Sequence, residues 1–530
     1  MLRCATYVAL GAALGALLLG ETSQALAQGQ ALTVLRQIDA DRYDPHRTTS
    51  RSAGEVVYMM ADTLVSLDWD MVTIKPGLAN SWAVSPDGLV YTFNLRDDVK
   101  FCDGRAMTAD DVVYSLKRWL DPAIKSPVAS RAGNVKEIRA KGNVTVEYEL
   151  NTPYSELLFQ LTQFFAVVID KDASEKLGQD FGVKGFNATG PWCWVSWEPR
   201  NQLVLQRNPH YRWGPPIYQN RGPAQIERVV WRVVPEDATR IAALQSGQGH
   251  ISQYVPYWAI DQIKANPQMQ LARADAYFWL WFIGFKVDKD VVADPRVRRA
   301  MNMGVNQEAI AKAVFFGHAK PARTYIDPKT PDYDKSLESR LIPFDPEGAR
   351  KLLDEAGWKA GSDGFREKDG KKLAPVFYAI SNSWSKLAEA VQGDLRKIGV
   401  DLKVQLWDAT VAWGKLGTQE FDAFGMSFPY VSALDAMNLY FRSTSTPTPN
   451  RMNWKNQETD KWLDDGRAAL TGEVRAAAMS RLQQQLYDAA VWIPIVHEEM
   501  FVSATKRLSG VRAHGIYGCG LYKGLDLKLN

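Results

Sequence analysis

The residues that could do chemistry in this chain of 530 residues form no catalytic pattern. The stretch His497-Glu498-Glu499-Met500 resembles the start of a zinc-protease helix, but that motif needs a second histidine at position 501, where Phe stands. The six histidines have no metal-ligand spacing, and the sequence has no GxSxG elbow, GxxxxGK phosphate loop or GxGxxG motif after a strand. We therefore expect no catalytic residues, no metal site and no cofactor.

Paired acids are the other candidates for chemistry, because two carboxylates can act together as general acid and base. The pairs Asp110-Asp111, Asp464-Asp465 and Glu498-Glu499 are most simply solvated faces or helix caps. Local sequence leaves open whether two carboxylates converge only in the folded chain, as in a glycosidase. A secreted hydrolase therefore stays a second interpretation.

The composition is that of a folded globular protein with little net charge. Lys and Arg number 63 and Asp and Glu 60, which gives a formal charge of +3, and hydrophobic residues make up 46%. A near-neutral balance argues against a nucleic-acid partner. Much of the aromatic content of 18 Trp, 20 Tyr and 20 Phe must be core, but so many tryptophans direct the search to a ligand surface.

Residues 1–27 have the features of an export signal. Arg3 precedes an apolar run over 7–20 that is too short to span a bilayer, and Ala25-Leu26-Ala27 forms a cleavage site. A buried N-terminal helix is the weaker alternative. Since no Cys follows the apolar run, we expect a cleaved signal peptide, no lipid anchor, and a location in the periplasm.

Cleavage leaves three cysteines, so at most one disulfide can form within the chain. They are Cys102, Cys193 and Cys519, and their spacing matches no zinc pattern. The sequence leaves their pairing open.

Strand and helix patterns alternate along the chain, which predicts an α/β or α+β architecture. Thr108 and Asp111 have the spacing of a capping box, which predicts an amphipathic helix over 109–120. Strands over 375–380 and 401–407 flank a helix over 384–398. These three elements form a strand–helix–strand unit.

The stretch 99–116, VKFCDGRAMTADDVVYSL, carries Phe-x-Asp-Gly, Thr-Ala-x-Asp-Val and Ser-Leu elements. It resembles the signature of the periplasmic solute-binding proteins of the dipeptide/oligopeptide/nickel-type ABC importers, bacterial extracellular solute-binding protein family 5. Cys102 stands where the family more often has His or Ser. Further matches occur in the family's order over about 32–510: 76–82, 87–96, 189–192, 207–211, 298–306 and 344–358.

The resemblance implies an α/β, two-lobed periplasmic-binding-protein fold with an inserted extra subdomain and a ligand cleft between the lobes. Lobe one would comprise about 28–62, 185–275 and 480–530, with the subdomain at 63–184, and lobe two about 276–479. The ligand would be buried by hinge closure, which it drives through its higher affinity for the closed form.

Peptide-binding relatives often hold the ligand ammonium with an acidic residue of lobe two, and its carboxylate with a basic residue. Tyr430 stands at the usual acidic position, and Asp435 is the nearest carboxylate. Lys386 stands where an Arg is usual, and Trp384 close before it is a further candidate for ligand contact. A buried charge-assisted hydrogen bond contributes about 1.5–3 kcal/mol, so such replacements change ligand choice. A solvated helix position for Lys386 and a cap for Asp435 are the alternatives.

The aromatic run over 277–282, YFWLWF, is a strand candidate at the start of lobe two. Alternation places Tyr277, Trp279 and Trp281 on one face, which we expect to line the cleft, while the other face packs in the core. Core packing is the alternative for each ring. Further candidates for ligand contact, with a surface salt bridge as the alternative for the last two, are Trp407, Arg36 and Asp39.

Together these features predict a monomeric, non-enzymatic binding protein that delivers a peptide or amino-acid conjugate to an inner-membrane ABC permease through a transient contact. An oligosaccharide, opine or metal chelate is the alternative ligand, since Trp-rich walls also suit sugar faces. A receptor or chaperone without transport is a further alternative.

Overall fold

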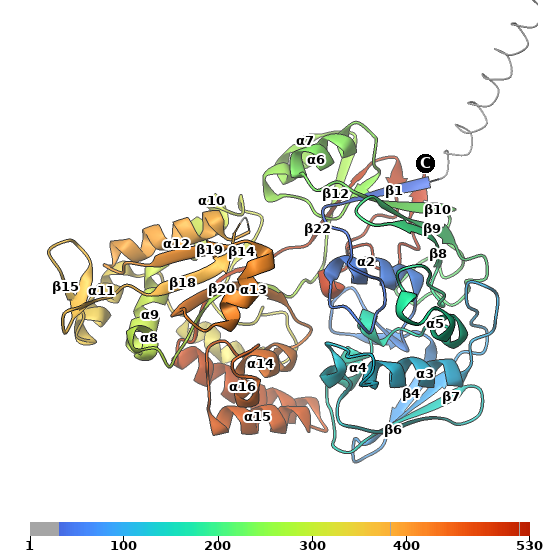
Figure 1. Cartoon of the computed structure of the whole chain (residues 1–530), viewed down its shortest axis with the longest axis horizontal. Coiled ribbons are helices and arrows are strands. Elements are labelled where there is room, and N and C mark those ends of the chain that lie inside the picture. The colour runs from blue at the N-terminus through green and yellow to red at the C-terminus, as the bar shows by residue number, and fades with distance from the viewer. Residues whose placement is uncertain (1–30, 382, 519) are drawn as a thin grey trace, which may run out of the picture.

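The computed structural model describes residues 31–381, 383–518 and 520–530. The expected export signal and Cys519 lie outside these residues. The described chain forms two α/β lobes, as expected, with the second lobe and its helices at the left of Figure 1. No helix in this part of the chain has the length and apolar character needed to cross a membrane.

Lobe one is built on a seven-stranded sheet. Its first strand lies near the middle, parallel to the strands on both sides, and its side chains Leu32 and Val34 are fully buried. The strand order is β12 (Met269–Arg273), β22 (Phe501–Thr505), β11 (Ile251–Ser252), β1 (Ala31–Arg36), β10 (Arg228–Val233), β9 (Gln202–Arg207) and β8 (Trp192–Glu198). The helices packed against this sheet are α2 (Arg51–Met60), α6 (Asp237–Gln245) and α7 (Ile260–Ala265).

The inserted subdomain has a four-stranded antiparallel sheet, at the lower right of Figure 1. Its order is β4 (Ala79–Val84), β5 (Val90–Leu95), β7 (Thr145–Leu150) and β6 (Val135–Ala140). Helix α3 (Ala109–Leu120) packs on β6 and β7 and has the predicted bounds, because its capping box forms. The Thr108 amide donates to Asp111 Oδ2 at 2.9 Å. Two shorter helices are α4 (Leu157–Gln160) and α5 (Lys171–Leu177).

A disulfide joins Cys102 to Cys193 with their Cα atoms 5.7 Å apart. It ties the loop before α3 to β8, and so fastens the subdomain to the sheet of lobe one. This is the pairing that the sequence left open.

Lobe two is built on a six-stranded sheet. The predicted strand–helix–strand unit is confirmed, since β18 and β19 pair in parallel on either side of α12 in the chain. The order is β14 (Lys320–Pro321), β21 (Trp492–His497), β13 (Trp279–Phe285), β20 (Ala423–Pro429), β18 (Val376–Ile380) and β19 (Lys403–Trp407). Its helices are α8 (Asp290–Ala293), α9 (Pro295–Gly304), α10 (Gln307–Ala313), α11 (Pro346–Glu355), α12 (Ser385–Lys397), α13 (Ala409–Gly417), α14 (Ala433–Phe441), α15 (Gln457–Arg467) and α16 (Gly472–Asp488).

Short sheets complete the fold. They are the pair β2 (Val65–Leu67) and β3 (Ile74–Pro76), the pair β23 (Leu508–Ser509) and β24 (Lys528–Leu529), and the triplet β15 (Lys359–Ala360), β16 (Arg366–Lys368) and β17 (Lys371–Lys372).

The chain crosses between the two large sheets at two places, 274–278 and 498–500, which we call the hinge segments. The first leads from β12 to β13 and the second from β21 to β22. Lobe one was expected to resume at about position 480. Strand β21 lies after that position but belongs to the sheet of lobe two, so the chain returns to lobe one only at the second hinge segment.

We expect the Cys102→Ser/Cys193→Ser double variant to lose about 2–5 kcal/mol of unfolding free energy, because the disulfide spans 91 residues and restricts the unfolded chain. Urea unfolding followed by tryptophan fluorescence measures the loss. Dithiothreitol should bring the parent protein down to the level of the variant and leave the variant unchanged. Equal stability of parent and variant without reductant would contradict the expectation.

Candidate functional site

The two hinge segments hydrogen-bond to each other. The Ala274 amide donates to the Met500 carbonyl at 3.0 Å, and next to the first segment the Glu498 amide donates to the carbonyl of Trp279, the first residue of β13, at 2.9 Å. Because dihedral changes in a few such residues rotate two rigid bodies, paired short crossings of this kind form a hinge.

Arg51, the first residue of α2, lies where the lobes meet beside the hinge. Its guanidinium is 4.5 Å from the centre of the Tyr254 ring and 5.5 Å from that of Trp279 in lobe two. Its Nε–H donates to the Gly518 carbonyl at 3.0 Å, and Glu55 on the next turn of α2 is 3.7 Å from the same nitrogen. Arg51 is therefore a cation held against aromatic rings of both lobes.

Two carboxyl groups are placed near Arg51. Burial raises the pKa of Glu55 and of Glu498, and the charge of Arg51 opposes both shifts. Glu498, in the second hinge segment, also accepts a hydrogen bond from Trp281 Nε1 at 2.8 Å. This bond joins the aromatic strand of lobe two to the hinge.

The aromatic strand β13 alternates as predicted. Leu280 and Phe282 are fully buried, whereas Trp279 and Trp281 are half-buried on the other face. The ring of Tyr277 stacks on that of Trp279 with centroids 5.7 Å apart. Ligand contact by Tyr277, Trp279 and Trp281 stays a prediction.

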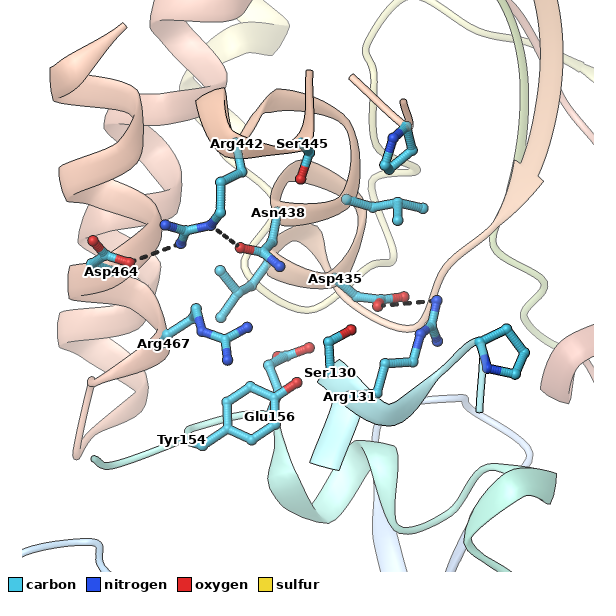
Figure 2. Close-up of a pocket in the computed structure, with 14 residues that line it drawn as sticks. Ser130, Arg131, Tyr154, Glu156, Asp435, Asn438, Arg442, Ser445, Asp464 and Arg467 are labelled. Atoms are coloured by element: carbon cyan, nitrogen blue, oxygen red, sulfur yellow. Dashed lines mark hydrogen bonds and ion pairs between the residues drawn. The ribbon is translucent and has the colours of Figure 1, made fainter. Parts of the chain in front are cut away.

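A cavity of about 640 Å³ lies between the inserted subdomain and helices α14 and α15 of lobe two (Figure 2). Its volume is in the range of pockets for small ligands. Tyr154 of the subdomain is the one aromatic residue among the described residues that line the cavity. Its charged lining is balanced between three arginines and three acids: Arg131, Arg442, Arg467, Glu156, Asp435 and Asp464.

The subdomain and lobe two contact each other directly beside this cavity. Ser432 Oγ of lobe two donates to Glu156 Oε2 at 2.6 Å. The Ser155 amide donates to the Arg467 carbonyl at 2.8 Å, and Ser155 Oγ donates to the Gly466 carbonyl at 2.7 Å. The structure therefore shows the lobes closed on the side of the cleft formed by the subdomain.

Two of the three arginines in the cavity have acidic partners. Arg442 forms an ion pair with Asp464 at 2.8 Å and donates from Nε to Asn438 Oδ1 at 2.8 Å. Arg131 of the subdomain lies 3.6 Å from Asp435 of lobe two. Both pairs are drawn in Figure 2.

Glu156 is the most perturbed acid of the cavity. Its side chain is 1% exposed, and burial raises its pKa to about 7. The nearby charges of Asp435 and Asp332 act in the same direction, and Ser432 and Arg475 oppose them. Its Oε1 atom has no hydrogen-bond partner within the described part of the chain.

Of the residues predicted for ligand contact, Asp435 lines the cavity. It is also a residue of the first turn of α14, where its amide donates to the Ser432 cap at Oγ, 3.0 Å away, and its Oδ2 accepts from the Val431 amide at 3.3 Å. Tyr430 is 3% exposed and its hydroxyl accepts from the Asp327 amide at 2.8 Å inside lobe two. Direct contact of either residue with ligand stays a prediction.

Arg36 and Asp39 form an ion pair with each other inside lobe one. Arg36 is fully buried and donates to the Tyr43 hydroxyl at 2.5 Å, and Asp39 accepts from Trp197 Nε1 at 3.0 Å. A surface salt bridge was the alternative to ligand contact for Arg36 and Asp39. The salt bridge is present, but it is buried.

The structure places Trp384, Lys386 and Trp407 away from the lining of the 640 Å³ cavity. Trp384 is 2% exposed and packs against Trp281 with centroids 5.6 Å apart, whereas Lys386 is exposed on α12. Trp407 is half-buried at the end of β19, with Lys415 Nζ 4.6 Å from its ring centre. Their ligand contacts remain predictions.

Sequence reasoning missed Arg51, Arg131, Glu156 and Arg467. One signal was available for Glu156, which stands directly before the apolar run Leu157-Leu158-Phe159. An acid at the edge of such a run is a candidate for burial, and a buried acid needs partners. The arginines carry no comparable local signal.

The His497-Glu498-Glu499 stretch is not helical. His497 ends β21 and the two acids begin the second hinge segment, so the resemblance to a zinc-protease helix is lost. Within the residues that the structure describes, no group of three His, Cys, Asp or Glu side chains is arranged to hold a metal ion.

The sequence pattern of the bacterial extracellular solute-binding proteins, family 5 (middle region), matches residues 73–449. The chain is 27% identical over 482 residues to the glutathione-binding protein GsiB of Salmonella paratyphi A, which covers 89% of both proteins. That relative is named as a binding protein.

Solved structures share the fold. The periplasmic binding protein DppA of Helicobacter pylori in complex with the peptide STSA superposes with a TM-score of 0.78 at 23% identity, over 94% of this chain and 98% of that one. NikA of Brucella suis in complex with Fe(III)-EDTA gives a TM-score of 0.82 at 23% identity, over 94% and 100%.

We expect Glu156→Gln to change the pH dependence of stability. A carboxyl whose pKa rises from 4.5 to about 7 on folding favours the folded state fully below pH 4.5, and this contribution is lost as the pH rises through about 7. The unfolding free energy of the variant relative to the parent should therefore increase between pH 4.5 and 7 by up to about 3 kcal/mol.

Urea unfolding at a series of pH values measures this difference. Glu137→Gln on the exposed strand β6 is the control and should leave the profile of the parent unchanged. A difference between Glu156→Gln and the parent that is constant with pH would contradict the assignment.

Proposed function

Because the chain belongs to the bacterial extracellular solute-binding proteins of family 5, we propose that it captures a peptide or amino-acid conjugate between its lobes and delivers it unaltered to an ABC permease. The observation that carries this proposal is the 640 Å³ cavity, whose charged lining comes from both sides of a hinged cleft. Ligands with both ammonium and carboxylate groups fit a lining of three acids and three arginines.

The relatives support a carboxylate-bearing ligand. GsiB is named as a glutathione-binding protein, and the DppA and NikA structures contain a peptide and an iron–EDTA chelate. All three ligands carry carboxylates, which arginine recognises in a bidentate manner. A metal chelate is therefore the second candidate ligand. An oligosaccharide fits less well, because Tyr154 is the one aromatic ring in the described lining.

The division of the chain and its location belong to the same proposal. Lobe one would comprise about 28–62, 185–275 and the region after the second hinge segment, with the subdomain at 63–184. The leader at 1–27 would be removed on export to the periplasm. The chain would have no enzymatic activity, in keeping with the named binding function of its relatives.

Native mass spectrometry of protein purified from the periplasm should reveal a bound small solute, and calorimetry with that compound should give its affinity. Small-angle X-ray scattering should show a smaller radius of gyration with ligand, because the lobes close on it. Absence of both binding and compaction would reject the proposal, and conversion of the compound by pure protein would reject the non-enzymatic role.

We expect Arg131→Gln to weaken binding of the co-purified solute by about 10- to 100-fold, because a buried charge-assisted hydrogen bond contributes about 1.5–3 kcal/mol. Calorimetry checks the loss. The control is Arg139→Gln, which removes another arginine of the subdomain from a surface network on β6. Similar affinities for the two variants would show that Arg131 does not contact the ligand.

A further inference from the structure

Glu156 is buried at the surface where the inserted subdomain meets lobe two. Its Oε2 atom accepts a hydrogen bond from Ser432 Oγ of lobe two at 2.6 Å. The preceding residue, Ser155, donates from its amide to the Arg467 carbonyl and from Oγ to the Gly466 carbonyl, both in lobe two. Opening of the cleft on this side breaks these bonds and admits water to the Glu156 carboxyl.

Glu156 has no cation of its own in the closed form. Arg131 of the subdomain lies 3.6 Å from Asp435 (Figure 2), and Arg475 of α16 forms an ion pair with Asp332 at 2.6 Å. No Lys, Arg or His side chain of the described chain lies at ion-pair distance from Glu156 itself. A buried negative charge without such a partner is strongly unfavourable, so a carboxyl in this position tends to become neutral.

Lobe two supplies the groups that determine the charge of Glu156. Burial and the charges of Asp435 and Asp332 raise its pKa to about 7, against the hydrogen bond of Ser432 and the charge of Arg475. Since all four residues belong to lobe two, this shift belongs to the closed form. The titratable and charged groups around the carboxyl are Arg131 of segment 129–132, Tyr154 of the subdomain, Asp332 of the loop after β14, Asp435 of α14, Arg467 of α15 and Arg475 of α16.

We propose that Glu156 is a proton-dependent latch, which lets the subdomain and lobe two close on each other when its carboxyl is protonated and favours the open form when it is ionised. This inference rests on the proposed function and describes how the same cleft is regulated. Closing takes up one proton from solvent onto the carboxylate, because the closed form holds that proton more tightly than the open form.

The direction of the pH dependence follows from this linkage. Closing is favoured fully below about pH 4.5, and this contribution is lost as the pH rises through about 7. The equilibrium constant for closing should therefore fall by up to about two orders of magnitude over this range.

Small-angle X-ray scattering of the ligand-free protein, prepared by dialysis in urea and refolding, tests the latch. The radius of gyration of the parent should be larger at about pH 8.5 than at about pH 5, because the lobes open as Glu156 ionises. Glu156→Gln is neutral at every pH and should stay compact. The control Glu137→Gln, on the exposed strand β6, should follow the parent.

Infrared spectroscopy reports the proton directly. The C=O absorption of a protonated carboxyl should be present in the parent at about pH 5, disappear as the pH rises to about 8.5, and be reduced by one group in Glu156→Gln. Arg475→Gln removes a charge that favours ionised Glu156 and leaves Asp332 without its partner, so the absorption should persist to higher pH. A merely loosened interface would hydrate the carboxyl and move its ionisation to lower pH.

Equal radii of gyration for the parent and Glu156→Gln at every pH would overturn the inference. So would infrared spectra in which these two proteins do not differ, or an Arg475→Gln variant whose carboxyl ionises at lower pH than in the parent. The two proposals fail separately, because the latch is tested on ligand-free protein and the proposed function on the binding of a co-purified solute.

Discussion

The paired hinge segments constrain the rest of this molecule. Because 274–278 and 498–500 hydrogen-bond to each other, the lobes are held to rotation about the line where these segments meet. When the lobes close about this line, the contacts between the subdomain and lobe two, on the side of the cleft away from the hinge, must therefore form at the same time. The bond from Trp281 to Glu498 attaches the aromatic strand of lobe two to the same line, so this strand moves with the hinge.

The contacts between the subdomain and lobe two beside the cavity include the Arg131–Asp435 ion pair, the stacking of Arg467 on Tyr154 and several hydrogen bonds. The hydrogen bonds of Ser432 to Glu156 and of Ser155 to Gly466 each contribute about 0.5–1.5 kcal/mol net, since water satisfies the same groups when the lobes are apart. A ligand bound between the lobes adds its own contacts to these in the closed form. The ligand can then determine which form predominates through its own differential affinity.

Local patterns in the sequence were sufficient for the elements that depend on neighbours along the chain. The capping box of Thr108 and the alternation through Trp279 and Trp281 were predicted because each is fixed within a few residues. The cavity was not predicted, except for Asp435, because Glu156 and Arg467 come from segments more than 300 positions apart. No local pattern records which distant segments a hinge brings together.

The charged lining of the cavity supports the proposed ligand class more directly than the aromatic content of the chain does. Trp-rich sequences suit sugar faces, but the tryptophans of β13 lie near the hinge, and Tyr154 is the one ring among the described residues lining the cavity. A neutral sugar would leave Glu156 and Arg467 desolvated without full partners, and each such group costs about 1–3 kcal/mol or more. A largely preformed site can reject ligands of the right size and the wrong charge by leaving its own polar groups without partners.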